Sequence, residues 1–392
     1  VKGPQSSRYG RNAFMGAVNY ISKKPTEELT SEAQLTVGSF GRFDASGAVS
    51  GAIVPEKLRV RASVDHSKYD GSWKNGHPFA DIDFSPGTDD RLGGWDDTTY
   101  SGAVQFLPTE GFEINASYMH LDKNREHSAQ NWFGELNADS QLLNCGQYNP
   151  DVRPAGSGLG GGGDWSRLFC GELPARAIPI DPRGYAQQLD TDLMRFSVAW
   201  DLNDTFSVDY QFGQIKANTK TFGYKDTWPG CTFFVPWCVF ESGPIGNFKT
   251  DSHEARVVFD NDSNINGAFG VYLAESSDFR TSNFAAAAVL TAVPTVAVDV
   301  LDPSAFIFQV ALSNITTVTK TKSVFGELNF SFNDDRARVG VEARYSSDKK
   351  EEGEAASGGG TGGLGAFAGA FFSDTFKSFT PRVTFEYDVS DD

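Results

Sequence analysis

Residues 337–345 read Ala-Arg-Val-Gly-Val-Glu-Ala-Arg-Tyr, and the alternation in this stretch decides the fold class. An apolar side chain stands at every odd-numbered position, while Arg338, Glu342 and Arg344 carry charge at even-numbered ones. Successive side chains of a β-strand point to opposite faces. The stretch therefore predicts a strand with one apolar face and one charged face.

The same two-residue period recurs along most of the chain, in segments of about ten residues, which is the length that a tilted strand needs to cross a bilayer. Glycine (41 residues) and aromatic residues (13 %) are frequent and methionine is scarce, as suits strands and turns. The period predicts about twelve strands, among them 33–39, 43–53, 58–68, 98–106, 112–118, 194–200, 206–212, 265–273, 324–332, 337–345 and 381–389.

Short and long connections between these strands alternate, which favours a membrane barrel over a soluble β-sandwich. Outer-membrane barrels have tight turns at one end and large loops at the other, and a sandwich does not need that asymmetry. Aromatic residues beside the short connections, such as Phe106, Phe112 and Trp200, suit an interfacial girdle. Short connections are expected near 54–57, 108–111, 202–205, 260–264 and 333–336, and long ones near 70–95, 123–190, 218–250, 280–316 and 348–376.

Charge and hydropathy exclude two other classes of protein. The net charge of −17 would repel a polyanion, so no nucleic-acid partner is expected. No run of 18 apolar residues is present to form a transmembrane helix, since Pro294 and Asp299 interrupt the nearest approach at 284–301.

The first 25 residues carry a motif: Val-Lys-Gly-Pro-Gln-Ser-Ser-Arg-Tyr-Gly-Arg-Asn-Ala-Phe-Met-Gly-Ala-Val-Asn-Tyr-Ile-Ser-Lys-Lys-Pro. From Lys2 to Pro25 it resembles the closing segment of the plug domain of TonB-dependent outer-membrane receptors. It departs from that pattern at Met15-Gly16, where relatives usually have two glycines. Residues 324–330, 339–345 and 379–383 look like mid-barrel strands of the same family.

The resemblance implies an all-β, transmembrane antiparallel barrel preceded by the last strand of a plug. The expected domains are residues 1–27, the end of the plug, and 28–392, the N-terminal half of the barrel. About twelve of the family's 22 strands would be present, as an interior piece of a longer receptor with two open strand edges.

The function implied by the resemblance is active uptake of a scarce, large solute across the outer membrane of a Gram-negative bacterium. A ferric siderophore or similar iron complex is the first choice, and an oligosaccharide or cobalamin is the alternative. The expected partners are TonB, through an N-terminal box that this sequence does not contain, outer-membrane lipid and the extracellular solute. From another class, a passive porin or a surface adhesin would also show alternating strands.

Four cysteines fall in the predicted long loops and none in a predicted strand: Cys145, Cys170, Cys231 and Cys238. An even number in an exported protein predicts disulfides. Three pairings are open, and the two local ones need the least loop closure. No metal site or cofactor is expected, because histidines do not accompany the cysteines. The sequence also shows no nucleophile elbow or carboxylate pair, so an enzyme is not expected.

Aromatic residues in the same loops are candidates for solute contact, because exposed rings offer a large rigid surface. Packing of the loops on one another explains them equally well. The candidates are Trp132, Phe133, Trp165, Trp228 and Trp237.

Four charged residues are candidates for seating the plug in the barrel. In the family, plug arginines pair with barrel glutamates, and a charge in a crowded barrel interior needs a partner. By resemblance, Arg8 and Arg11 belong to the plug, while Glu327 and Glu342 fall on the interior phase of their strands. The hypothesis pairs Arg11 with Glu327 or Glu342.

We expect the substitution Arg11→Ala to loosen the plug and to raise the passive leak of large antibiotics through the receptor. The physical reason is the loss of the cation that a barrel glutamate requires. Uptake of a large antibiotic by cells that carry the variant measures the leak, and an unchanged rate would contradict the hypothesis.

Overall fold

The structure is a computed structural model, and it describes residues 22–74, 91–126, 186–224, 237–260, 264–288, 308–332, 336–354 and 371–388. None of the described residues belongs to a helix that is long and apolar enough to cross a membrane.

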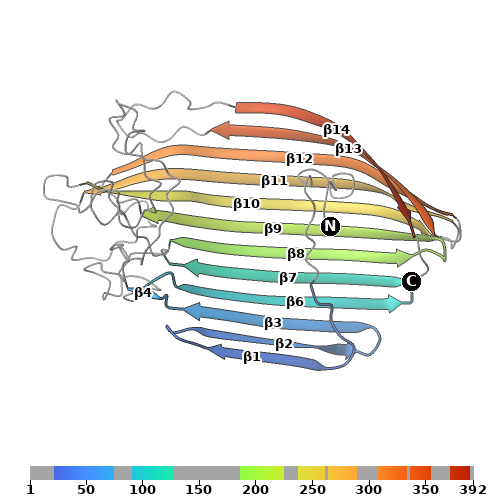
Figure 1. Cartoon of the computed structure of the whole chain (residues 1–392), viewed down its shortest axis with the longest axis horizontal. Helices are drawn as coiled ribbons and strands as arrows, with labels where there is room; N and C mark the ends of the chain where they lie inside the picture. The colour runs from blue at the N-terminus through green and yellow to red at the C-terminus, as the bar shows by residue number, and fades with distance from the viewer. Residues whose placement is uncertain are drawn as a thin grey trace.

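A single antiparallel sheet of twelve strands contains almost all of the described residues (Figure 1). Each strand of this sheet pairs with the next one along the chain, except that the two-residue strands β4 (Trp73–Lys74) and β5 (Arg91–Leu92) pair separately between β3 and β6. The sheet consists of β1 (Thr30–Val37), β2 (Phe43–Val54), β3 (Leu58–Tyr69), β6 (Trp95–Thr109), β7 (Phe112–Arg125), β8 (Gln187–Asp201), β9 (Phe206–Tyr224), β10 (Trp237–Asp260), β11 (Ile265–Ala288), β12 (Phe308–Phe332), β13 (Ala337–Glu354) and β14 (Phe371–Tyr387).

The two edges of the sheet, β1 and β14, do not pair with each other among the described residues. Figure 1 shows the strands side by side as a curved sheet, and β13 and β14 curve downward at the right-hand side of the view. The predicted all-β fold, with about half a barrel and two open edges, is confirmed.

Several strands extend well beyond the segments that alternation predicted. β11 continues to Ala288 although the predicted strand ended at residue 273, and β9 continues to Tyr224 instead of residue 212. The predicted strand 381–389 is only the second half of β14. The reason is that alternation is needed only where one face of the strand meets hydrocarbon, whereas backbone pairing continues beyond that zone.

The connections alternate between short and long, as predicted. For example, β8 and β9 are joined through residues 202–205, while β7 and β8 are joined through 126–186. One prediction about the loops is wrong. The backbone of Trp237 and Cys238 forms the start of β10, opposite Ala288 and Ala287, although the run from Trp237 to Phe240 is apolar without alternation.

The two faces of the sheet differ in polarity. The exposed face is apolar and the buried face is polar, which is the reverse of the arrangement in a soluble protein. On the face that we call the outer face, large apolar side chains are exposed to the surroundings, as a lipid contact requires. On the other, the inner face, polar side chains are buried. Exposed outer-face residues include Val64, Tyr100, Val104, Tyr118, Met194, Phe196, Phe269, Val271, Leu328, Val341, Tyr345, Val383 and Phe385, and buried inner-face residues include Ser50, Gln105, Thr319, Thr321, Ser323, Arg344, Ser346 and Asp348.

Arg344 shows how tightly the inner face is packed, since only 5 % of this residue is exposed. Its guanidinium carbon lies 5.3 Å from the ring centre of Tyr272 and 5.1 Å from that of Phe325. Gly270 makes room for the second ring, because a Cβ atom there would lie 2.4 Å from Phe325. The absence of a side chain at residue 270 thus permits the stacking of arginine on two rings.

The substitution Gly270→Ala should destabilise the sheet by about 1–3 kcal/mol, the usual cost of overpacking. Urea unfolding of the full gene product in detergent measures the effect, and Gly102→Ala is the matched control because nothing lies within 4 Å of its Cβ position. Adding Phe325→Leu should restore part of the lost stability. Equal stability of the two alanine variants would contradict this account.

Candidate functional site

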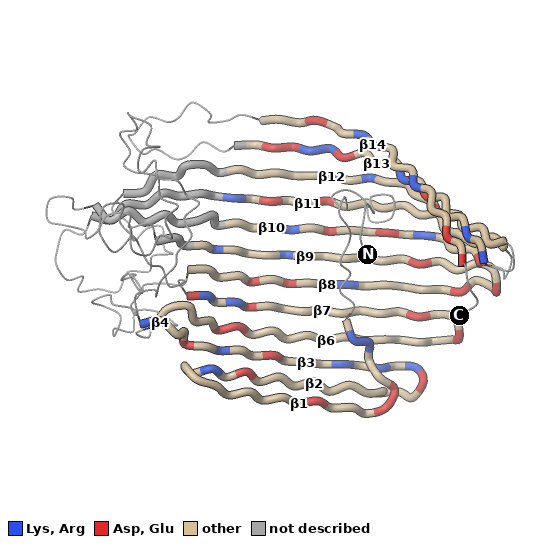
Figure 2. The backbone as a smooth tube through the Cα atoms, in the orientation of Figure 1, with Lys and Arg blue, Asp and Glu red and all other residues tan. Residues whose placement is uncertain are grey.

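A short segment crosses the inner face of the sheet just before β1, and we call residues 22–29 the anchor segment. Figure 2 shows it running from the neighbourhood of β6, over β3, to the start of β1. The Nζ atom of Lys24 lies 3.0 Å from Oε1 of Glu113, on β7. These residues are 89 positions apart in the sequence. The contact therefore holds the segment against β7, the fifth strand of the sheet counted from β1.

Glu113 is the centre of a polar network on the inner face. Besides Lys24, its Oε1 atom accepts hydrogen bonds from Nε2 of Gln105 (2.7 Å) and Nδ2 of Asn115 (2.9 Å). The Oε1 atom of Gln105 in turn accepts one from Nη1 of Arg59, at 3.1 Å. Gln105 is only 4 % exposed, so the network lies within the side-chain layer and not on an open surface.

Glu32 forms the second attachment of the anchor segment. Its carboxylate lies 3.0 Å from Nζ of Lys23 and 2.5 Å from Nη2 of Arg61. Two cations therefore share one carboxylate, in a place where Lys23 and Glu32 keep more than half of their side-chain surface exposed. Exposed pairs of this kind stabilise by no more than about 1 kcal/mol each.

Glu27 forms the third attachment, at the short-turn end of the sheet. It accepts a hydrogen bond from the backbone N–H of Glu56 (2.8 Å) and one from Nε of Arg59 (2.6 Å). Glu56 has a φ of 63°, in the turn between β2 and β3, so the carboxylate holds a strained residue in place. These two donors, the backbone amide foremost, lower the pKa of Glu27 below its ordinary value of 4.5.

Buried Ser50 completes the anchorage with backbone contacts. Its Oγ atom accepts a hydrogen bond from the N–H of Thr26 at 2.9 Å and donates one to the carbonyl of Val60 at 3.1 Å. The N–H of Ala52 donates to the carbonyl of Glu27 at 3.1 Å. Together with the three carboxylate attachments, these bonds fix the path of the chain where it leaves the inner face and enters β1.

The two glutamates predicted to seat the plug are neighbours on the inner face. Glu327 on β12 and Glu342 on β13 are direct cross-strand partners, an arrangement that places like charges side by side. Glu342 also lies 3.3 Å from Nη1 of Arg382, on β14. Arg8 and Arg11 lie outside the described residues, so their pairing with these glutamates stays a prediction.

The predicted solute contacts and disulfides fall almost entirely outside the described residues. This applies to Trp132, Phe133, Trp165 and Trp228, and to Cys145, Cys170 and Cys231. Trp237 and Cys238 are placed by their backbone alone, at the start of β10. These residues therefore stay predictions as solute contacts and as disulfide partners.

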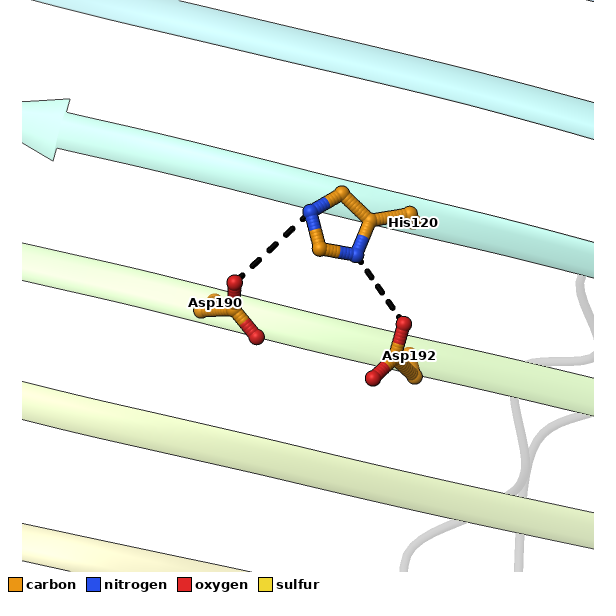
Figure 3. Close-up of side chains that lie close together, drawn as sticks. All are labelled: His120, Asp190 and Asp192. Atoms are coloured by element: carbon orange, nitrogen blue, oxygen red, sulfur yellow. Dashed lines mark hydrogen bonds and ion pairs between the residues drawn. The ribbon is translucent and has the colours of Figure 1, made fainter.

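A histidine between two aspartates is the one group of potential metal ligands in the described part of the chain (Figure 3). Nδ1 of His120 lies 2.9 Å from Asp192, and Nε2 lies 3.6 Å from Asp190. Each ring nitrogen thus faces its own carboxylate, which suits a pair of ionic contacts better than a shared ion. The group lies on the outer face, in register with Tyr100, and not on the inner face that carries the anchor segment.

Sequence reasoning missed the anchor network, although Lys23 and Lys24 were noted as part of the motif. The motif alone does not indicate which acidic residues these two lysines contact. A usable signal was the inner-face phase of Glu113 and Glu32, since each is a carboxylate at a polar position of an alternating strand.

Comparison with known proteins assigns the fold to a family. The sequence profile described as "TonB dependent receptor-like, beta-barrel" matches residues 128–392, well over half of the chain. The chain therefore belongs to the TonB-dependent receptor family, whose members are β-barrel proteins of the outer membrane of Gram-negative bacteria.

Solved structures agree with this assignment at the level of the fold. The chain is similar to the ferric yersiniabactin uptake receptor FyuA from Yersinia pestis (16 % identity, TM-score 0.62), with 100 % of this chain and 49 % of that one covered. It is also similar to the ferric citrate transporter FecA (10 %, 0.64, covering 100 % and 47 %) and to the siderophore receptor PiuA from Acinetobacter baumannii (13 %, 0.62, covering 99 % and 51 %). The chain thus spans about half the length of these structures.

Protonation of Glu27 should loosen the anchor segment. A lowered pKa in the folded state means that the stabilisation is complete above pH 4.5 and is lost as the pH falls through the lowered value. A spin label attached at Glu28→Cys should therefore become mobile only in that acidic range. In the background Glu27→Gln it should be mobile at neutral pH as well.

Electron paramagnetic resonance of the full gene product measures this mobility, with the protein that lacks the Glu28→Cys change as the labelling background. Glu28 suits the label because its side chain is exposed. An immobile label in the Glu27→Gln variant at neutral pH would show that Glu27 does not hold the segment.

Proposed function

We propose that this protein takes up a scarce iron complex, most simply a ferric siderophore, across the outer membrane with energy from TonB. The family and the fold support uptake by a receptor of this kind. The choice of an iron complex is supported by the printed names of the similar structures, which include receptors for ferric yersiniabactin and ferric citrate.

The anchorage of residues 22–29 on the inner face is the observation that carries the proposal. An open diffusion channel does not need a chain that is bonded across the inside of its wall. Lys24 on Glu113 and Lys23 on Glu32 place the end of the motif of residues 1–25 against the inner face, where a plug would leave the barrel. This supports residues 1–27 as the end of a plug and 28–392 as barrel, and it disfavours a passive porin.

The polar inner face gives the proposed transport path its chemistry. Several of its charged side chains pair within the wall and need no solute, such as Arg256 with Asp209 at 2.9 Å. Pairs of this kind keep their partners when a plug is displaced, so they leave no isolated charge behind. The loop aromatics, including Trp132 and Trp165, are proposed to capture the solute before it enters.

Uptake of radioactive iron supplied as single siderophores tests the proposal in the native organism. Deleting the gene should abolish accumulation of one siderophore or siderophore class while leaving the others unchanged. Loss of TonB, or collapse of the proton gradient, should abolish the same uptake in cells that keep the gene.

The alternatives give different results in the same cells. Uptake of an iron complex that persists without TonB would support a porin and would contradict the proposal. If no siderophore depends on the gene but accumulation of an oligosaccharide or cobalamin does, the receptor class stands and the substrate proposal is wrong. If no solute accumulates in a way that depends on both TonB and the gene, the uptake proposal is wrong and a surface adhesin is the remaining alternative.

The substitution Glu113→Gln should raise passive leak of large antibiotics severalfold, because Lys24 would lose its charged partner on β7. Asn115→Ser is the control, since Asn115 contacts Glu113 but not the anchor segment. Antibiotic susceptibility of cells that express equal amounts of each variant measures the leak. Equal leak through the two variants would contradict a role for the anchor in holding the plug.

A further inference from the structure

The apolar band of the outer face ends at a sharp boundary on strands β12 to β14. Val324, Tyr345 and Phe379 lie side by side across these strands and form its last row. The next outer-face row, two residues nearer the long connections, consists of Lys322, Ser347 and Lys377. The change from apolar to cationic residues within one step marks the level at which the strands leave hydrocarbon.

Four lysines gather immediately beyond this boundary, and we call Lys320, Lys322, Lys349 and Lys377 the lysine patch. Lys320 and Lys349 are direct cross-strand partners, so two cations face each other. Like charges in such a position destabilise a sheet unless an anion compensates them. With neighbouring strands less than about 5 Å apart, the patch is compact enough for one ligand to reach all four ammonium groups.

Carboxylates within the sheet compensate the patch only in part. Glu275 lies 3.5 Å from Lys320, and Glu351 lies 2.5 Å from Lys349. Lys322 and Lys377 have no ion pair within the described ranges. About half of the side-chain surface of Lys320 and of Lys349 stays exposed, so their ammonium groups are accessible from the lipid side.

Elsewhere on the outer face, beyond the apolar rows, the charges are mixed. On β7 and β8 Asp122 lies opposite Asp190 and His120 opposite Asp192, while on β9 and β10 Lys216 lies opposite Lys249, which pairs with Asp251 at 2.7 Å. The chain as a whole carries a net charge of −17. Four lysines on three adjacent strands therefore form a local cationic site in an acidic protein.

We propose that the lysine patch binds the phosphate groups of an anionic glycolipid in the outer leaflet of the membrane. The charges are complementary, and the position favours a lipid over a free anion. A lipid whose phosphates reach the lysines would lay its acyl chains on Val324, Tyr345 and Phe379 directly below. A soluble anion would gain nothing from that apolar row.

Binding of lipid A to the full gene product in detergent tests the inference, with diphosphorylated lipid A as the probe. The fourfold variant with Lys320, Lys322, Lys349 and Lys377 changed to Gln should bind it on the order of 10²-fold or more weakly, at about fivefold for each lysine. The unsubstituted protein should lose a similar factor with dephosphorylated lipid A. Inorganic phosphate should not compete with the lipid.

Lys350→Gln is the matched control for Lys349→Gln. Lys350 follows Lys349 directly but faces the inner side of β13, where it lies 3.1 Å from Glu352. The control should bind lipid A like the unsubstituted protein, and the Lys349→Gln variant should bind about fivefold more weakly. These single variants keep the test decisive if the fourfold variant does not fold.

Three results would overturn the inference. One is equal binding by the fourfold variant, once it is shown to be folded by its heat-dependent migration in electrophoresis. Another is equal binding of phosphorylated and dephosphorylated lipid A, which would show that the acyl chains alone account for the affinity. The third is full competition by inorganic phosphate, which would identify a site for free anions.

Discussion

The need to satisfy every backbone hydrogen bond within hydrocarbon is the constraint on which the rest of this structure depends. No water is available there to pair an exposed N–H or C=O group, so a spanning strand needs a neighbour on each side. Within the described residues, every strand of the twelve-stranded sheet except its edges, β1 and β14, has one on both sides. β10 illustrates the result, since it pairs with β9 and β11 along almost its whole length. The order of strands follows the order of the chain, both across the tight turns and across long connections such as 126–186.

Given that sheet, the two faces carry side chains suited to different surroundings. The outer face holds apolar side chains such as Phe269 and Val383 against the surroundings, and the inner face buries polar ones such as Ser50 and Gln105. The anchor segment depends on this division, because Lys24 can reach Glu113 only over a wall that offers polar partners. The lysine patch lies on the outer face, directly beyond the last row of its apolar band.

Alternation predicted the part of each strand that lies in the membrane, but not where the strand ends. The start of β11 at Ile265 agrees with the predicted residue, while its end lies at Ala288, far beyond the last alternating position. Beyond the hydrocarbon both faces are polar, so the sequence there resembles a loop although the backbone remains paired. Trp237 and Cys238 lie at the start of a strand and not in a loop, and the run from Trp237 to Phe240 hides this because it is apolar throughout and does not alternate.

The sequence by itself determined the class of fold, the membrane-facing side of each strand, the positions of the turns and the family. Those properties depend on the local alternation of apolar and polar residues and on a contiguous motif, and both can be read from the sequence alone. Only the tertiary structure decided which charges meet. The contacts of Lys24 with Glu113, of Glu27 with the Glu56 amide, and of Lys320 with Lys349 depend on strand register. Register is set by cross-strand pairing over the whole sheet, and a shift of one residue would move each side chain to the opposite face.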